Sequence, residues 1–274
     1  MPELPEVETV KRTLTPLVNG KKIIRLEAPR PEILAHPAAA EFAKRVEGAT
    51  LQELARRGKY LLLPLDNGAT IIVHLRMTGR LLYNAADYPL QPHTHIIFHL
   101  EDGNQLRFSD TRRFGRIWLK EADEEDTFSG ISKLGPEPFG APFGSEWLAD
   151  KLGKRKINIK QGLLDQSVVA GLGNIYVDEV LYVAQIDPRR LTNQVSKQEW
   201  QRVAEAIPRI LEQAIANNGT TFRDYVDGTG QKGSYMPFLE AYGRKGQPCR
   251  RCATPIEQIR LAGRSTCYCS KCQK

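Results

Sequence analysis

Five cysteines, all near the end of this 274-residue chain, are the residues whose spacing points most directly to chemistry. Four of them form the pattern Cys249-x2-Cys252-x16-Cys269-x2-Cys272, in which each Cys-x2-Cys turn presents two thiolates to one point. Zn²⁺ prefers four such soft ligands in a tetrahedron, so the pattern predicts a zinc site. Two disulfides are the alternative, and the odd fifth cysteine, Cys267, and the lack of a secretion signal argue against them.

A metal ion held by four thiolates has no open coordination position, so we expect one structural zinc ion (Zn2+) rather than a catalytic one. Between the two cysteine pairs, residues 259–266 are typical of a β-hairpin with Gly263 near its turn. Arg264 then lies at or beside a rigid tip, where its cation either contacts a phosphate or is simply solvated. Cys267 is expected to be buried or to support a zinc ligand.

The opening Met1-Pro2-Glu3 is a second candidate for chemistry. Removal of Met1 would leave Pro2 with a secondary amine, and an α-amino group has a pKa of about 7.7–8, so part of it is neutral near pH 7. Such an amine attacks an electrophilic carbon, and with an aldehyde-level carbon it forms a cationic iminium that withdraws electrons. Glu3 is then a candidate general acid or base. A Pro-Glu pair that only opens a helix is the alternative.

The first half of the chain predicts one helix followed by a set of short strands. Residues 5–18 carry apolar side chains at helical spacing. Beyond them, short aliphatic runs alternate with turns such as Asp66-Asn67-Gly68, which predicts a β-sandwich interrupted by a helix near 38–46. The expected strands cover 23–27, 60–65, 70–76, 80–83, 95–100, 105–109 and 116–119.

After a Gly- and Pro-rich stretch the apolar period becomes helical, over 145–152, 157–166, 174–184 and 196–216. Ser196 and Glu199 form a capping box at the start of the last helix. Residues 219–238 have no period, and we expect either a cover for a substrate or an ordinary surface loop. The fold class is α+β, with an N-terminal β-sandwich flanked by helices (1–130), a linker (131–148), a helical domain (149–238) and a zinc finger (239–274).

The net charge of +7 is unevenly distributed along the chain. Residues 1–148 hold 19 basic and 20 acidic side chains (19 − 20 = −1), and residues 149–274 hold 20 and 12 (20 − 12 = +8). A basic second half favours a polyanionic partner such as nucleic acid. No apolar run approaches the roughly 20 residues of a membrane span, and no apolar leader is present, so we expect a cytoplasmic protein without membrane contact.

Short motifs follow one another in a specific order along essentially the whole chain. They are Pro2-Glu3-Leu4-Pro5-Glu6, Arg57-Gly58-Lys59-Tyr60-Leu61, His74-Leu75-Arg76-Met77-Thr78-Gly79, His93-Thr94-His95, Asp110-Thr111-Arg112-Arg113-Phe114-Gly115, Leu134-Gly135-Pro136-Glu137-Pro138, Gly171-Leu172-Gly173-Asn174-Ile175-Tyr176 and Tyr242-Gly243-Arg244-Lys245-Gly246, with the four-cysteine tail. Together these motifs resemble bacterial formamidopyrimidine-DNA glycosylase (Fpg, or MutM). Leu4 departs from the Pro-Glu-Gly-Pro-Glu opening that is typical of the sister family, endonuclease VIII.

The resemblance implies a monomeric base-excision repair enzyme that removes oxidised purines, chiefly 8-oxoguanine and formamidopyrimidines, from double-stranded DNA and then nicks the strand. It makes Pro2 the nucleophile at C1′ of the damaged nucleotide and makes Glu3 the group that assists protonation and ring opening. Lys59 would contact the lesion and assist proton transfers. Arg264 would grip the flanking phosphates and assist β- and δ-elimination.

The same resemblance implies a set of DNA contacts. The damaged nucleotide must be flipped out of the duplex to reach Pro2, and Met77, Arg112 and Phe114 would fill the hole that it leaves. The helical domain would be a helix-two-turn-helix (H2TH) domain, with 219–238 as a loop that caps the lesion. The residues expected to contact DNA are His93, Arg112, Arg155, Lys160, Asn174 and Tyr242.

Two other functions stay open at this point. One is an endonuclease VIII-like glycosylase that prefers oxidised pyrimidines. The other is a non-catalytic zinc-ribbon protein that only binds damaged DNA. This second alternative would follow if Met1 were retained, because an acylated Pro2 nitrogen is not a nucleophile.

Overall fold

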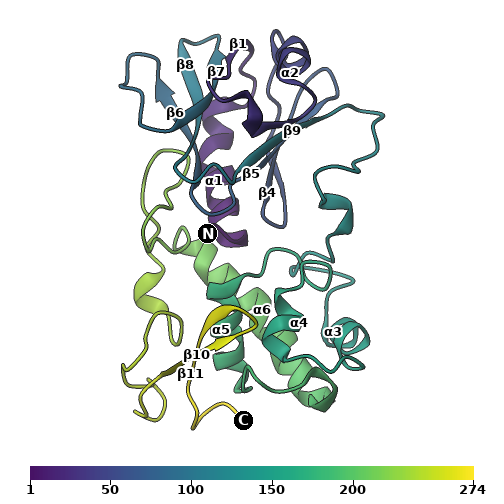
Figure 1. The fold of residues 1–274 in the computed structure, drawn as a ribbon, viewed down its shortest axis with the longest axis vertical. Helices are drawn as coiled ribbons and strands as arrows, with labels where there is room; N and C mark the ends of the chain where they lie inside the picture. The colour runs from purple at the N-terminus through teal and green to yellow at the C-terminus, as the bar shows by residue number, and fades with distance from the viewer. The chain divides into compact units, whose positions relative to one another are not determined.

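The computed structural model describes residues 1–274, and the chain divides into two compact units (Figure 1). The first unit contains Met1–Ser132 and Asn217–Ser234, and the second contains Lys133–Ala216 and Tyr235–Lys274. This division differs from the expected domains, because most of the expected linker 131–148 belongs to the second unit. Residues 217–234, which we expected in the helical domain 149–238, belong to the first unit.

The first unit contains two β-sheets, with strand orders β1-β7-β8-β6 and β2-β9-β5-β4-β3. Neighbouring strands are antiparallel except for β2 and β9. The seven strands expected from the sequence are present, and two three-residue strands, β2 and β3, were not expected. The strands are β1 (Ile23–Glu27), β2 (Leu34–His36), β3 (Ala55–Arg57), β4 (Tyr60–Pro64), β5 (Thr70–His74), β6 (Gly79–Ala85), β7 (Thr94–Leu100), β8 (Asn104–Asp110) and β9 (Arg116–Lys120).

Two helices complete this unit, α1 (Leu4–Val18) and α2 (Ala39–Val46). The α1 side chains Val7, Val10 and Leu14 recur at helical spacing and are buried in one core with side chains of both sheets. Each fully buried aliphatic side chain of this kind stabilises the fold by about 1.5–3 kcal/mol. The core therefore fixes the helix that begins directly after Pro2 and Glu3.

Residues 217–234 pack along α1 without forming a helix or strand. The backbone N–H of Gly228 donates to the Thr13 hydroxyl (3.0 Å), and the Gly228 carbonyl accepts from the N–H of Tyr83 (2.9 Å). A Cβ atom on Gly228 would lie 2.4 Å from Cγ of Leu14, which is closer than two carbon atoms can approach. Glycine is therefore required where this segment crosses the helix.

The second unit combines four α-helices with a two-stranded hairpin near the C-terminus. The N–H of Ser196 donates to the Glu199 carboxylate (2.8 Å), which confirms the expected capping box. The α3 helix begins at Ser145, inside the stretch 131–148 that we expected to be a linker. The elements are α3 (Ser145–Leu152), α4 (Ile159–Leu164), α5 (Asn174–Ala184), α6 (Lys197–Ala216), β10 (Glu257–Leu261) and β11 (Arg264–Tyr268).

Short 3₁₀ turns lie at Pro31–Ile33, Ile131–Lys133, Thr192–Gln194 and Met236–Phe238. None of the helices combines the length and the apolar character that crossing a membrane requires.

Gly228→Ala tests the close approach of residues 217–234 to α1. The added methyl group has no space beside Leu14, so we expect the free energy of unfolding to fall by about 1–3 kcal/mol. Gly140→Ala is the matched control, because a Cβ atom there meets no atom within 4 Å. Urea unfolding of the two variants checks this, and equal stabilities would contradict the described packing.

Candidate functional site

The N-terminal residues of interest lie at the start of α1. Pro2 and Glu3 are buried, with Glu3 only 2% exposed, whereas Met1 before them is 46% exposed. Glu3 is the N-cap of α1, and its backbone N–H donates to the carboxylate of Glu6 (2.8 Å) in a capping box. The helix therefore fixes the backbone that follows Pro2.

Glu6 is a functional candidate that the sequence reasoning did not single out. It is 1% exposed, and its second carboxylate oxygen accepts from the backbone N–H of Thr220 (2.8 Å). One buried carboxylate thus binds both the N-cap of α1 and the segment 217–234. The spacing of Glu3 and Glu6, three residues apart at a helix start, is the signal that could have found it.

Lys59 lies in the tight turn between β3 and β4, next to Gly58, whose φ is +55°. Lys59 is 7% exposed, so its stem is buried as expected for a residue of a site rather than of the open surface. The turn is fastened to the first helix, because Arg56 on β3 forms an ion pair with Glu8 of α1 (2.9 Å). The structure therefore brings the β3–β4 turn and the helix that carries Pro2 and Glu3 into one packed assembly.

A neutral histidine accompanies Lys59. Burial, together with the cations Arg76 and Lys59, lowers the pKa of His74 to about 3. Its Nδ1 accepts from the backbone N–H of Arg76 (3.0 Å), and its ring meets that of Tyr60 edge-on, with centroids 4.6 Å apart. Tyr60 in turn donates to the carbonyl of Ser129 (2.8 Å), so this region is held by fixed polar contacts.

The three residues expected to intercalate come together at the surface of the first unit. Nη1 of Arg112 lies 2.9 Å from Sδ of Met77, and the Arg112 guanidinium lies over the Phe114 ring, 4.7 Å from its centroid. Met77 is 41% exposed and Phe114 is 48% exposed, although both are large and apolar. Exposed apolar side chains that cluster with a cation fit insertion into a base stack.

Buried Asp110 organises the loop that carries Arg112 and Phe114. Its carboxylate accepts from the N–H groups of Arg112 (3.1 Å) and Gly115 (2.7 Å) and from the Thr78 hydroxyl. Its carbonyl binds Nε2 of His95 (2.8 Å). Sequence reasoning did not single out Asp110, although its position at the end of a strand, before a polar turn, is a signal for such a role.

His93 lies beside this loop with its side chain exposed and φ at +66°. It lines a pocket together with Thr78, Arg80, Gln91, Pro92, Ser109, Asp110 and Thr111. Most of the residues that line this pocket are polar, and the His93 side chain is accessible to solvent. The structure thus places this expected DNA contact next to the Met77–Arg112–Phe114 cluster, within the same unit.

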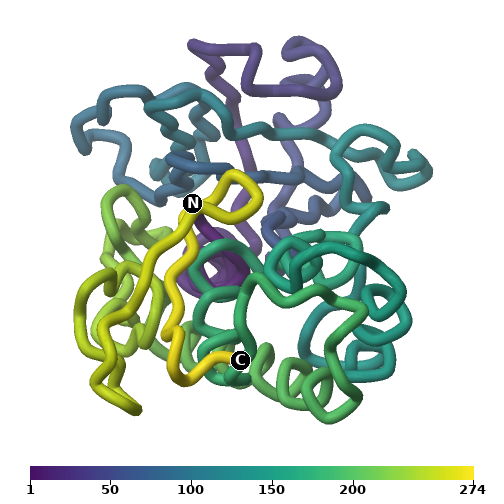
Figure 2. The backbone as a smooth tube through the Cα atoms, turned by 60° about the horizontal axis from the view of Figure 1, so that its bottom comes forward, coloured from purple at the N-terminus to yellow at the C-terminus, as the bar shows by residue number.

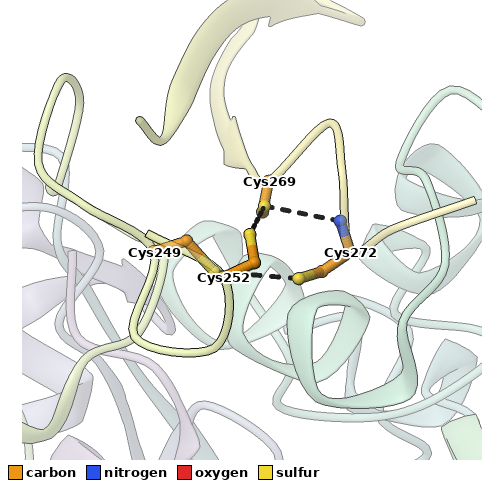
Figure 3. Close-up of side chains that lie close together, drawn as sticks. All are labelled: Cys249, Cys252, Cys269 and Cys272. Carbon is orange, nitrogen blue, oxygen red and sulfur yellow. Dashed lines mark hydrogen bonds between the residues drawn. The ribbon is translucent and has the colours of Figure 1, made fainter. Parts of the chain in front are cut away.

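In the second unit, the four expected zinc ligands form one cluster (Figure 3). The Sγ atoms of Cys249 and Cys272 are 3.9 Å apart, those of Cys252 and Cys269 are 3.5 Å apart, and all four lie within 4.8 Å of one another. A zinc–sulfur tetrahedron with bonds of about 2.3 Å has edges of about 3.8 Å. The four sulfurs therefore fit one zinc ion, and no ligand position remains open for catalysis.

Tyr182 of α5 supports one of these ligands, with its hydroxyl 3.2 Å from Sγ of Cys249. Although burial alone would raise it, the hydrogen bonds of Tyr182 and of the Arg251 and Cys252 N–H groups hold the pKa of Cys249 below its usual value. A metal-bound thiolate can only accept, so the phenol donates when zinc is present. Sequence reasoning did not find Tyr182, because nothing in the helical spacing shows which residue faces the zinc ligands.

The expected hairpin is confirmed, and Figure 2 shows it as a narrow yellow loop. Leu261 pairs with Arg264 across a two-residue turn of Ala262 and Gly263, whose φ angles are +48° and +75°. Positive φ at both positions matches the turn type that suits tight hairpins. Arg264 is exposed beside the tip, and Cys267 is buried at 3% exposure, both as expected.

Three of the expected DNA contacts in this unit have partly accessible side chains. Arg155 forms an ion pair with Asp165 (3.1 Å) while remaining 42% exposed. Asn174 at the start of α5 donates from Nδ2 to the Ser265 carbonyl (3.1 Å), and its Oδ1 is buried without a hydrogen-bond partner. The N–H of Tyr242 donates to Glu179 (2.8 Å), and its side chain is half-buried.

The fourth expectation, Lys160 as a DNA contact, is wrong. Its side chain is 1% exposed, and its Nζ binds Oδ1 of Asp178 (2.7 Å) and the carbonyl of Ser265 (2.9 Å). An ammonium enclosed in this way has no path to a phosphate. The family resemblance implied this contact, but the acidic partner of Lys160 lies 18 residues further along the chain.

Comparison with protein-family models gives three matches that cover most of the chain. They are the formamidopyrimidine-DNA glycosylase N-terminal domain (residues 1–117), the formamidopyrimidine-DNA glycosylase H2TH domain (134–226) and the zinc finger found in Fpg and IleRS (246–274). The chain is therefore a DNA glycosylase built from a β-sandwich, an H2TH domain and a zinc finger, and the finger holds one structural zinc ion.

Similar proteins extend over the full length. The formamidopyrimidine-DNA glycosylase of Desulforamulus reducens is 49% identical, covering 100% of this chain and 99% of its own. That of Moorella thermoacetica is 51% identical, covering 95% of each chain. A complex of wild-type Lactococcus lactis Fpg (MutM) with DNA containing N7-benzyl-Fapy-dG matches with a TM-score of 0.93 at 38% identity, over 100% of both chains. The chain belongs to the formamidopyrimidine-DNA glycosylase family.

The depressed pKa of His74 predicts acid sensitivity. Unfolded His74 binds a proton near pH 6.5 but folded His74 does so only near 3, so lowering the pH across this window favours the unfolded state. We expect stability to fall by up to about 1.4 kcal/mol per pH unit from this residue. Urea unfolding at pH 7.5 and 5 checks this, and His74→Asn should lose less stability between them. Equal losses would contradict a buried neutral His74.

Cys269→Ser tests the zinc site. Replacing one of four thiolates by a hydroxyl weakens zinc retention and, because the hairpin depends on the metal, DNA binding with it. Zinc content and DNA affinity are the measurements, with the buried non-ligand Cys267→Ser as the control for loss of a thiol. Full zinc content in Cys269→Ser would contradict Cys269 as a ligand, and unchanged DNA affinity in a zinc-depleted variant would show that the hairpin does not need the metal.

Proposed function

We propose that this enzyme excises oxidised purines, chiefly 8-oxoguanine and formamidopyrimidines, from double-stranded DNA and cleaves the abasic site by β,δ-elimination. The observation that carries the proposal is the start of α1. There Pro2 directly precedes Glu3, which a buried capping box with Glu6 holds in place, in the unit that also displays Met77, Arg112 and Phe114.

Pro2 is the proposed nucleophile once Met1 has been removed. Met1 is the exposed end of the chain, so it is accessible to an aminopeptidase, and its loss converts the Pro2 amide nitrogen into an amine. The amine attacks C1′ of the damaged nucleotide, the base leaves, and the open sugar forms an iminium with Pro2. Glu3 delivers or accepts the proton that ring opening needs.

Strand cleavage follows from the same iminium. Its positive charge makes the C2′ hydrogen acidic, so a base removes that proton and the 3′ phosphate leaves by β-elimination. A second elimination, δ, then releases the 5′ phosphate. We assign proton transfers at the lesion to Lys59 and assign grip on the flanking phosphates to Arg264, whose exposed guanidinium lies beside the hairpin tip.

Damaged DNA must be deformed for this chemistry. Pro2 reaches C1′ only if the nucleotide leaves the base stack, and the Met77–Arg112–Phe114 cluster is suited to fill the space. Further contacts with the DNA are assigned to His93, Arg155, Asn174 and Tyr242. Residues 219–238 are assigned to cover the extruded base, and Thr220 links that segment to Glu6 at the start of α1.

Purine specificity is supported by the relatives rather than by one residue of this chain. The Lactococcus lactis protein was crystallised with Fapy-dG derivatives, and another similar structure, with a TM-score of 0.93 at 37% identity, is MutM with DNA containing carbocyclic 8-oxoguanine. The first lesion is a ring-opened purine and the second is an oxidised purine. The endonuclease VIII-like and non-catalytic functions are the alternatives that the experiment must exclude.

Borohydride trapping tests the chemistry. Reduction of the iminium should join the protein covalently to a duplex with 8-oxoguanine opposite cytosine, and mass spectrometry should locate the bond at Pro2. The same chain with an uncleaved N-terminal extension is the control, because its Pro2 nitrogen is acylated and should give no adduct. Intact mass first establishes that Met1 is absent. A processed protein that binds this duplex without adduct or nick is only a DNA-binding protein.

Substrate comparison separates the two enzyme classes. Under single-turnover conditions we expect 8-oxoguanine to be excised faster than thymine glycol from otherwise identical duplexes. The reverse order would favour the endonuclease VIII-like function, while leaving the Pro2 chemistry intact.

A further inference from the structure

An ion pair lies buried in the second unit and has no part in the proposed chemistry. Nζ of Lys160 on α4 is 2.7 Å from Oδ1 of Asp178 on α5, and the two side chains are 1% and 0% exposed. Removing two charges from water can cost as much as their attraction returns, so the net contribution of such a pair to stability can be close to zero. The groups that the pair contacts are then the better guide to its role.

The object that the pair holds is strand β11. The second oxygen of Asp178 accepts from the backbone N–H of Cys267 (2.8 Å), and Lys160 donates to the carbonyl of Ser265 (2.9 Å). Asn174, one turn before Asp178 on α5, donates to the same carbonyl (3.1 Å). Each of these bonds goes to the backbone, so they fix where the strand runs whatever its side chains are.

Arg264 is the residue directly before these anchor points. Ser265 follows it in the chain, and Arg264 is also the first residue of β11, paired with Leu261 across the turn. Cys269, the zinc ligand that follows the other end of β11, is five residues from Arg264. The zinc therefore secures the base of the hairpin, whereas Lys160 and Asp178 secure the end that carries the arginine.

We propose that Lys160 and Asp178 are positioning residues for Arg264, which set its guanidinium at the phosphate where elimination occurs. This inference rests on the proposed function, because it assigns Arg264 to the elimination step. It predicts that the pair affects strand cleavage through Arg264 and not through the stability of the fold. A purely structural pair would affect cleavage only as far as it affects folding or zinc content.

The decisive variant replaces both charges with apolar side chains of similar size, Lys160→Met with Asp178→Leu. Such replacements of buried ion pairs usually preserve the fold, but here they remove the bonds to Ser265 and Cys267. Asp178→Asn is the second variant, in case the double variant fails to fold, and it keeps the shape while weakening both bonds. Zinc stoichiometry and thermal unfolding are measured first on the zinc-loaded proteins.

Elimination is then measured by itself, on a duplex with a preformed abasic site under single-turnover conditions. We expect Arg264→Gln to slow this step by about 100-fold, as for other lost transition-state donors. The folded, zinc-loaded pair variant should slow it by at least about 10-fold, since a displacement near 1 Å has effects of this size. Glu199→Gln is the matched control: it weakens the Arg190–Glu199 ion pair of the same unit (3.0 Å) and should leave the rate unchanged.

Combining the pair variant with Arg264→Gln gives the discriminating result. If the pair acts through Arg264, elimination by the combined protein should be at most about 2-fold slower than by Arg264→Gln alone. Binding to the abasic duplex is also measured at several salt concentrations. In either variant, the slope of log affinity against log salt concentration should become shallower by about 0.9, which corresponds to the loss of one phosphate contact. The inference would be overturned if the rate reductions of the two variants multiplied in the combined protein. It would also be overturned if the pair variant eliminated at the normal rate.

The two proposals fail differently. A normal elimination rate in Arg264→Gln would remove Arg264 from the proposed function and the positioning inference with it. If elimination is slow in Arg264→Gln but normal in the pair variant, only the positioning inference is overturned.

Discussion

A hairpin of two five-residue strands is too small to keep its shape alone in water, and this constraint governs the C-terminal part of the second unit. The position of Arg264 therefore depends on what the hairpin is fastened to. Four thiolates fasten one end through zinc, and the helical domain fastens the other through the backbone of β11. Both anchors consist of directed bonds, and they act beside a small apolar cluster that includes Tyr182, Ile256 and Cys267.

Three directed bonds to this region start from one helix, α5. Asn174, Asp178 and Tyr182 follow one another at intervals of four residues on α5. The first two bond to the backbone of β11, and the third contacts a zinc ligand. Glu179 beside them accepts from three consecutive backbone N–H groups, up to that of Tyr242. Burial raises the pKa of Glu179 to about 7, even though those three donors favour its charged form. The helix thus determines the geometry of the C-terminal region.

Features encoded by local spacing could be predicted from the sequence, and features that depend on distant partners could not. The four zinc ligands and the hairpin turn followed from residue types a few positions apart. The strands β2 and β3 were not predicted, because three residues carry no alternation. The DNA contact assigned to Lys160 was wrong because its partner, Asp178, is on another helix. The place of residues 217–234 depends on bonds such as that of Thr220 to Glu6, far away in the chain.

The bond between Thr220 and Glu6 also bears on how the protein is made. Residues 217–234 belong to the first unit, so that unit is not one continuous stretch of chain, and the backbone passes between the units three times. Domains generally fold as they leave the ribosome, N-terminal parts first. Here the sandwich emerges early, but the buried carboxylate of Glu6 lacks its partner until residue 220 has been synthesised. The start of α1, where the proposed nucleophile lies, is therefore completed only after most of the second unit's helices already exist.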